Sequence, residues 1–520
     1  RLVGSEMCIR DRYILGVAFA AMLGFGSCVD LDMEPQGSPE AGEVADERMA
    51  FLRLAAVYSD VKSFFYTWSM QCFGDVLSED ATYSGSANDA STFQLMENFQ
   101  YPADHNEILN KYKQSYQCIN KANLFIRDME QTSDEIFSKY NKEQMIGEAK
   151  FIRAYTYFEL VKIFGEVPCY TDVLELDHER LGRASLETIY ATIEKDLNEA
   201  AAVLPLKSEV PDYLAQYAGR ITKGAAYAMQ TRVYLYEEKY EEVKRVFKEN
   251  IQPLIPGEYD LENDYKYMFS LEGEHCQESI LEVCMYTSTN LSGYTTNNGN
   301  RHVLMSMPRN MTIGFGCAQP TQALADAYDA VGDTKRKNVT LLSRQEAIDI
   351  ELAAHPGAVY GDKEVPEITD DRTGWYNRKM YLAPGQREEN YGNNQPTNLR
   401  LIRLAEVYLN YAEACSKTND EVNAIKYLNL IRERADLAGY PNLTGDANLS
   451  VFEAIMQERH LEFGMEGFRF FDVVRVGWGE KVFYPGFKSQ FGRDEGFKKG
   501  ADKLPIPQIE IDISNGGITN

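Results

Sequence analysis

The feature that most constrains the fold is a helix-hairpin pattern at 401–435, LIRLAEVYLNYAEACSKTNDEVNAIKYLNLIRERA. Apolar and small residues recur there in steps of three and four on both sides of a polar break at 418–420. This spacing predicts two helices, each with one apolar face. Two such faces joined by a short turn are hidden only when the helices pack antiparallel, and one hairpin cannot bury its own outer face. The chain must therefore supply further helices.

The hairpin also has the size pattern of a tetratricopeptide repeat of about 34 residues. When Ala405 is counted as the first position, Ala412 and Ala424 fall on small-residue positions and Leu428 on a large apolar one. A second, weaker hairpin is predicted over 222–250. By the same periodicity, helices are expected over 48–73, 105–129, 142–164, 186–204, 320–328 and 451–463.

The segment 251–399 differs, because it is rich in Gly, Asn and Pro and has little helical period. Its clearest strand pattern lies at 279–286, and the tail at 504–511 is expected to be extended because of its prolines. Long loops within compact domains are uncommon unless they bind something. The predicted fold is therefore mostly α. It is a single domain at 46–520, with helical repeats at about 105–250 and 400–475 and a loop-rich, minor-β ligand-binding insert at about 251–399.

The N-terminal part has the layout of a secretory signal. A short apolar run at 13–25 follows Arg10 and Arg12 and precedes Gly26-Ser27-Cys28. We expect Cys28 to be the acylated first residue of a lipoprotein and 29–45 to be a tether rich in Asp, Glu, Pro and Gly. The alternative is a plain signal with an unrelated cysteine. The first twelve residues are interpreted as a spurious start and are left out of the fold.

Composition excludes several functions. With 53 Lys and Arg against 79 Asp and Glu, the formal net charge is −26, which repels phosphate backbones and argues against nucleic-acid binding. Nine cysteines without a C-x-x-C pair and six histidines without H-E-x-x-H predict neither a metal centre nor a disulfide framework. No cofactor motif is recognised. The chain also lacks G-x-S-x-G, and no nucleophile with a base and an orienting group is recognised.

The loops contain residue types that suit carbohydrate recognition, which uses aromatic faces for sugar rings and planar amide, carboxylate or guanidinium groups for hydroxyls. Three sets are the candidate ligand-binding residues: Asp75, Asp80, Tyr83 and Asn88; Tyr294, Asn297, Asn298 and Arg301, with His302 beside them; and Trp375 with Tyr376. The alternative for each is an ordinary solvated loop residue. Trp68, which falls on a predicted helix, is assigned to the core.

Charged residues near the C-terminal end are interpreted as structural. Glu458, Glu462 and Glu466 are four apart on one predicted helical face, and Arg459 and Arg469 are close enough to form salt bridges. A catalytic carboxylate pair would instead need environments that move the two pKa values apart. Trp478 and its charged neighbours, Arg469, Asp472 and Arg475, are likewise assigned to packing and ion pairing.

Several segments together carry a family resemblance. They are CVDLD at 28–32, GEAKFIRAYTYFELVKIFGEVP at 147–168, GRITKGAAYAMQTRVYLYEEKYEE at 219–242, ESILEV at 278–283, PTQALADAY at 320–328, IRLAEVYLNYAEA at 402–414, IMQERHLEFGMEGFRFFDVVR at 455–475 and LPIPQIEI at 504–511. In this order they resemble the SusD/RagB family of outer-membrane nutrient-binding lipoproteins of Bacteroidetes. The family has no fixed motif for its ligand site.

The resemblance implies a scaffold of four tetratricopeptide-like hairpins, a less regular ligand-binding part and a partner SusC-like TonB-dependent transporter. The expected function is non-enzymatic capture of an oligosaccharide at the outer surface of the outer membrane, on a lipid anchor, and delivery to that transporter. Alternatives are peptide uptake within the same family, a secreted glycan-degrading enzyme and a scaffold for protein partners. We expect the ligand on the irregular side, at 75–90, 290–302 and 372–381, and not in the groove of the repeats.

Overall fold

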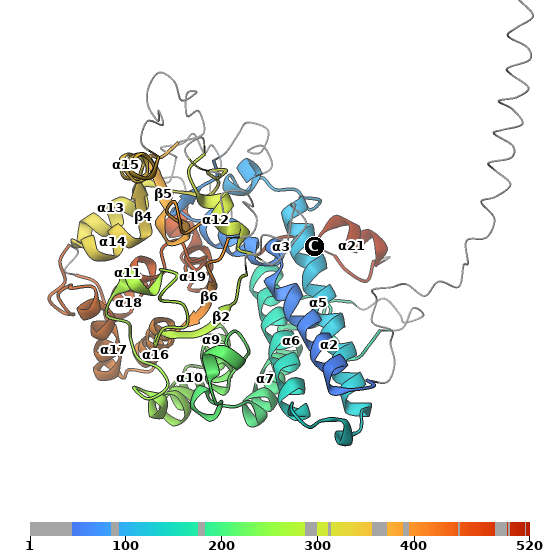
Figure 1. The fold of residues 1–520 in the computed structure, drawn as a ribbon. Helices are drawn as coiled ribbons and strands as arrows, with labels where there is room; N and C mark the ends of the chain where they lie inside the picture. The colour runs from blue at the N-terminus through green and yellow to red at the C-terminus, as the bar shows by residue number, and fades with distance from the viewer. Residues whose placement is uncertain are drawn as a thin grey trace, which may run out of the picture. The chain divides into compact units, whose positions relative to one another are not determined.

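The structure is a computed structural model that describes residues 44–84, 93–174, 182–286, 299–309, 312, 314–355, 372–387, 395–445, 448–483, 497, 500–514 and 516–519. The chain from Glu43 onward forms one unit (Figure 1). Cys28 and the predicted tether up to 43 lie outside the described residues. Within the described ranges, no helix has both the length and the apolar character that crossing a bilayer requires.

The protein is mostly helical, as the sequence predicts. The helices of the first half are α2 (Glu47–Lys62), α3 (Phe64–Ser69), α5 (Asn106–Gln131), α6 (Lys142–Phe164), α7 (Leu186–Val203), α8 (Tyr213–Gln216), α9 (Lys223–Tyr236) and α10 (Tyr240–Val246). Those of the second half are α11 (Tyr265–Met268), α12 (Arg301–Ser306), α13 (Gln322–Val331), α14 (Thr334–Thr340), α15 (Arg344–Ala354), α16 (Leu404–Lys417), α17 (Glu421–Arg434), α18 (Val451–Glu462), α19 (Arg469–Arg475), α20 (Gly479–Phe483) and α21 (Gln508–Ile513). Short 3-10 or π turns are η1 (Met70–Asp75), η2 (Asp134–Ile136), η3 (Lys207–Glu209), η4 (Phe247–Ile251), η5 (Gln252–Leu254) and η6 (Arg378–Met380).

Three small antiparallel sheets join segments that are far apart in the sequence. They pair β1 (Ala81–Thr82) with β3 (Gln319–Pro320), β2 (Ser279–Val283) with β6 (Leu399–Arg403), and β4 (Leu341–Ser343) with β5 (Trp375–Asn377). Each sheet has two strands and cannot be stable by itself. The sheets therefore act as clamps between the helical scaffold and the less regular segments.

The helices stack in the order α5, α6, α7, α9, α10, α16, α17 and α18, each contacting the next. Figure 1 shows α2, α5, α6 and α7 side by side, with α16 and α17 beyond α10. Both predicted hairpins are confirmed as α9 with α10 and α16 with α17. Ala405, Ala412, Ala424 and Leu428 are all buried. The small side chains of the three alanines let the helix backbones approach closely.

Some predicted boundaries are wrong. The hairpin begins at Leu404, not at 401, because 399–403 forms β6 and pairs with β2. Residues 508–513 form α21, since the tail is extended only up to Pro507. Helices α14 and α15 were not expected inside 251–399. Both helices begin at caps: the Asp333 side chain accepts from Arg336 N at the start of α14, and Ser343 with Glu346 forms a capping box at the start of α15.

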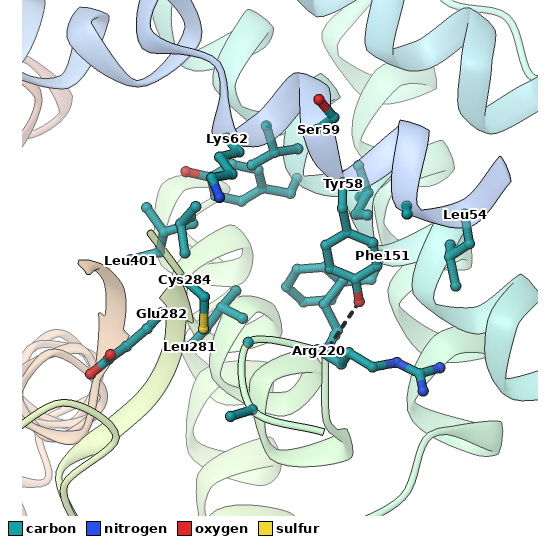
Figure 2. Close-up of a pocket in the computed structure, with 18 of the residues that line it drawn as sticks. Leu54, Tyr58, Ser59, Lys62, Phe151, Arg220, Leu281, Glu282, Cys284 and Leu401 are labelled. Atoms are coloured by element: carbon teal, nitrogen blue, oxygen red, sulfur yellow. Dashed lines mark hydrogen bonds between the residues drawn. The ribbon is translucent and has the colours of Figure 1, made fainter. Parts of the chain in front are cut away.

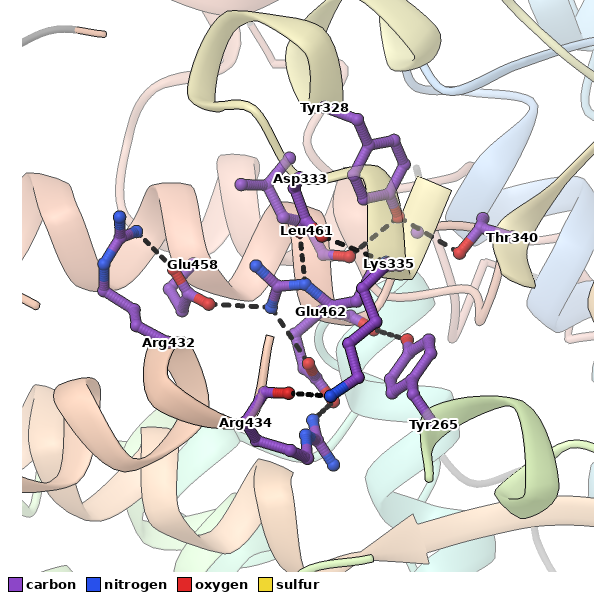
Figure 3. Close-up of polar contacts among 12 residues, drawn as sticks. Tyr265, Tyr328, Asp333, Lys335, Thr340, Arg432, Arg434, Glu458, Leu461 and Glu462 are labelled. Carbon is purple, nitrogen blue, oxygen red and sulfur yellow. Dashed lines mark hydrogen bonds and ion pairs between the residues drawn. The ribbon is translucent and has the colours of Figure 1, made fainter. Parts of the chain in front are cut away.

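A buried ion network joins α14, α17, α18, β6 and the residue before β2. Figure 3 shows part of it, including Asp333, Arg432, Arg434, Glu458 and Glu462. Its members are Arg336, Arg403, Arg432, Arg434, Glu278, Asp333, Glu458 and Glu462, all nearly inaccessible. Glu462 is the shared partner: its carboxylate pairs with Arg403 and Arg434, and with Arg336 at 3.0 Å. Glu458, Glu462 and Glu466 are ion-paired as predicted, with Glu466 bonded to Lys379 at 2.7 Å. The predicted partners are wrong, because Arg459 pairs with Asp472 and Arg469 pairs with Glu79.

The charges of the network balance, and this balance makes their burial tolerable. A lone buried charge costs several kcal/mol, roughly, whereas a paired and hydrogen-bonded one is largely compensated. Burial by itself would raise the pKa of Glu462. The guanidinium groups of Arg434, Arg403 and Arg336 outweigh that effect and hold the pKa well below its usual range. Glu462 is therefore ionised at neutral pH.

We expect Glu462→Gln to lower the free energy of unfolding by about 3–5 kcal/mol, because three buried guanidinium groups lose their shared counter-ion. Urea denaturation followed by circular dichroism measures this quantity. The matched control is Glu242→Gln, which breaks an exposed pair with Arg245 and should cost at most about 1 kcal/mol. Equal losses in the two variants would contradict a structural role for the network.

Candidate ligand-binding site

The structure brings the first and third predicted ligand-binding regions together around residues 319–322 and places the second against α3. β1, from the first region, pairs with β3, and Thr321 N donates to Asp80 O at 2.8 Å. From the third region, Arg372 N donates to the Gln319 side chain at 3.1 Å. In the second region, His302 of α12 lies 2.8 Å from the Thr67 hydroxyl on α3. The three regions are thus neighbours on the irregular side of the helices.

The expected exposure of the first set is wrong, because Asp75 and Asp80 are completely buried. Gly74 lies so close to the loop after α18 that an added Cβ would stand 2.0 Å from the carbonyl oxygen of Gly467. Asp75 then accepts a hydrogen bond from Gly467 N at 2.9 Å, and Asp80 bonds to His460 at 2.5 Å. Burial, together with the charge of Asp80, raises the pKa of Asp75 well above its usual value. These carboxyl groups hold two chain segments together.

Two of the predicted aromatic platforms are also buried. Tyr83 is 1% exposed and is stacked on Phe93, with ring centroids 4.1 Å apart and planes 9° apart. Tyr376 is 1% exposed, because its place opposite Leu342 in the β4–β5 pair turns it into a small apolar cluster with Ala347. Neither ring is available for stacking on a sugar.

The remaining candidates, Asn88 of the first set and the members of the second set, are only partly described. Asn88, Tyr294, Asn297 and Asn298 lie outside the described residues, and Arg301 is half-buried at the start of α12. His302, next to it, is buried, and burial together with the charge of Arg301 lowers its pKa to about 3. His302 is therefore neutral. It packs against Trp68, which is in the core as predicted, with ring centroids 5.6 Å apart.

Among the predicted aromatic residues that the structure describes, Trp375 keeps part of its side chain accessible. It is placed opposite Ser343 by the β4–β5 pair, and its backbone N–H donates to the Thr373 hydroxyl at 3.1 Å. The indole Nε1–H donates to Gln322 Oε1 at 3.0 Å, across to the first turn of α13. The ring is thus held by two elements, and its orientation is fixed before any ligand arrives.

Gln322 of α13 and Lys337 of α14 contact this ring, and each pairs with a carboxylate of α13. Gln322 donates from its amide to Asp326 at 2.7 Å. The Lys337 ammonium lies 5.5 Å from the Trp375 ring centroid and pairs with Asp329 at 2.6 Å. Asp326 and Asp329 are exposed on α13. We call Trp375, Gln322, Asp326, Asp329 and Lys337 the Trp375 surface.

The Trp375 surface combines the groups that sugar recognition uses: an aromatic ring, an amide, two carboxylates and an ammonium. Sequence reasoning missed the four polar members. The available signal was the spacing of Gln322 and Asp326, four apart on the predicted helix at 320–328, which puts both on one helical face. Their proximity to Trp375 depends on the β4–β5 pairing and had no local signal.

One group among the described residues has metal-ligand types within reach: atoms of Glu79, Asp80 and His460 lie within 4.8 Å of one another. Both carboxylates already have partners. Arg469 donates to Glu79 and His460 pairs with Asp80, so these contacts compensate the charges that a cation would neutralise. Glu79 and Asp80 thus form buried polar contacts with His460 of α18 and Arg469 of α19.

Comparison with known proteins identifies the family. The family model described as "SusD family" matches residues 359–516, and the model described as "Starch-binding associating with outer membrane" matches 64–235. A SusD-like protein of Bacteroides ovatus is 25% identical over 487 residues, covering 89% of this chain and 82% of the relative. These matches support the SusD/RagB family for this chain. A second relative, SusD-like protein P2 of Formosa agariphila, is 24% identical over 520 residues and covers 94% and 95% of the two chains.

Solved structures of SusD-like proteins share the fold. A structure described as a laminarin binding SusD-like protein is 28% identical, with a TM-score of 0.74 and coverage of 91% of this chain and 98% of that chain. Surface glycan-binding protein A from Bacteroides thetaiotaomicron in complex with laminarihexaose is 22% identical, with a TM-score of 0.75 and coverage of 91% and 99%. The predicted family and fold class are both confirmed.

The burial of Tyr83 generates a stability prediction. We expect Tyr83→Ala to lower the free energy of unfolding by about 3–5 kcal/mol, the range for removing a buried aromatic ring. Trp375→Ala should cost less than about 2 kcal/mol, because its ring is partly solvated already. Chemical denaturation compares the two variants. A larger loss for Trp375→Ala than for Tyr83→Ala would contradict the assigned burial of these rings.

Proposed function

We propose that this SusD-family protein binds a glycan on the Trp375 surface and does not modify it. The observation that carries the proposal is the half-buried ring of Trp375, fixed by Gln322 and bordered by Lys337 and two exposed carboxylates. A sugar ring has an apolar face, which stacks on an indole, and a rim of hydroxyls, which bond to amide and charged groups. The laminarin-binding SusD-like protein, 28% identical, supports a glycan as the ligand class.

The geometry favours binding over hydrolysis. Glycoside hydrolysis needs two carboxyl groups that face each other across the scissile bond and have separated pKa values. On the Trp375 surface the two carboxylates lie on one helix, and each is bonded to a neighbour, Asp326 to Gln322 and Asp329 to Lys337. Such groups suit hydroxyl recognition, so we propose a non-enzymatic role.

The further parts of the proposal concern location and partner. We infer a lipoprotein acylated at Cys28, held on the outer face of the outer membrane, that delivers its glycan to a SusC-like TonB-dependent transporter. The matching family description "associating with outer membrane" and the signal-like layout before Cys28 support this inference. A Cys28→Ala variant that stays folded and leaves the membrane fraction is the expected result. Retention of that variant in the membrane fraction would contradict the anchor.

We expect Trp375→Ala to weaken glycan binding by about 1–2 kcal/mol, a five- to thirty-fold rise in Kd, because the stacking platform is lost. Titration calorimetry with laminari-oligosaccharides, or with the best ligand from a glycan array, measures it. The matched control is Trp478→Ala, which removes another half-buried indole that packs edge-on against Phe452, with centroids 5.6 Å apart. Its Kd should not change.

Two outcomes would overturn the proposal. Equal Kd values for the wild type and Trp375→Ala, with both proteins folded, would place the ligand elsewhere. Release of new reducing ends from the polysaccharide, abolished by Asp326→Asn or Asp329→Asn, would show that the protein is an enzyme. Thermal melts of each variant separate loss of binding from loss of fold.

A further inference from the structure

A second concave site lies away from the Trp375 surface, between α2, α6 and the β2–β6 pair. Its cavity volume is about 370 Å³, near the low end of the range for small-molecule pockets, about 300–1,000 Å³. Most of its wall is hydrocarbon, including Leu54, Tyr58, Phe151, Ile152, Leu281 and Leu401 (Figure 2). The concavity is open to solvent on one side, so an apolar occupant would remove this hydrocarbon wall from water.

Two of the charged residues that line the cavity turn their charges away from it. Figure 2 shows the Arg220 guanidinium pointing outward, and its Nε–H donates to Glu148 at 3.1 Å. The Glu282 carboxylate points to the opposite side, where it accepts from Ser279 at 2.6 Å and from Asn398 at 2.9 Å. Neither charge is available to an occupant of the cavity.

Lys62, in the last turn of α2, is different. Its amino end lies at the cavity, on the side of Leu401 and Cys284 (Figure 2). It is half-buried, and within the described part of the chain it forms no ion pair. Burial lowers its pKa, which is the cost of holding a poorly solvated ammonium without a counter-ion. An anion at this place would remove that cost.

We propose that this cavity binds a small amphipathic carboxylate, with its apolar body among the hydrocarbon walls and its carboxylate paired with Lys62. A sugar fits the site poorly, because its hydroxyls need partners on several sides and these walls offer few. A polyanion fits poorly as well, because the cavity presents a single unpaired ammonium. The size limits the occupant to one ring or a short branched chain. The inference is independent of the glycan site, since the two share no residue.

The test uses 4-phenylbutyrate as the probe and its neutral analogue 4-phenylbutan-1-ol, titrated by calorimetry into the full chain. We expect the carboxylate to bind about tenfold more tightly than the alcohol, the scale of one charge-assisted hydrogen bond. Lys62→Met should remove this tenfold preference, and Lys62→Arg should restore most of it. The matched control Lys121→Met removes a nearby cation that already pairs with Asp60 at 2.7 Å, and it should leave the preference intact.

A second readout locates the probe. Cys284 lines the cavity and is only partly buried, as are Cys169 and Cys276 outside it. Bound 4-phenylbutyrate should slow the alkylation of Cys284 by a neutral maleimide, measured by peptide mass spectrometry, and should leave the other two rates unchanged. The proposal is overturned by an absence of saturable binding, by equal affinity for the two probes, by loss of preference in Lys121→Met, or by unprotected Cys284.

Discussion

The buried pairing of Glu462 with three arginines is the interaction on which the rest of the irregular half depends. Arg336 ties α14 to Glu462, Arg403 ties the end of β6 to it, and Arg434 ties the end of α17 to it. The next residue after Arg336 is Lys337, whose side chain reaches the Trp375 ring. Tyr328 adds a second tie, because its hydroxyl donates to Leu461 O at 2.7 Å and so joins α13 to α18. The ion network therefore positions the helices that carry the candidate site.

This arrangement explains how a site made of loops and short helices can be rigid. Two-stranded sheets and helices of one or two turns have little stability of their own. Here their ends are fixed by buried ion pairs, and a misplaced arginine would leave a carboxylate uncompensated. The preorganised Trp375 ring then loses little conformational freedom when a ligand binds, which favours affinity.

The sequence predicts those parts of the structure whose cause is local. The helical period of 401–435 and the small residues Ala412 and Ala424 establish a hairpin without knowledge of its neighbours, and the spacing of Glu458 and Glu462 indicates salt bridges. The burial of Tyr83 has a different origin. It depends on stacking against Phe93 and on the close approach of Gly74 to Gly467, a contact between segments almost four hundred positions apart. Loop composition does not encode such contacts, so polar loop residues were mistaken for exposed ones.

The central claim is that the glycan lies on the irregular side, against Trp375, and not among the helices of the repeats. A crystal structure of the protein with its glycan tests this most directly. The account predicts a sugar ring stacked on the accessible part of Trp375, with hydroxyls bonded to the carboxylates of α13 or to Lys337. A glycan bound in the groove formed by α6, α7 and α9, with the Trp375 surface empty, would contradict it.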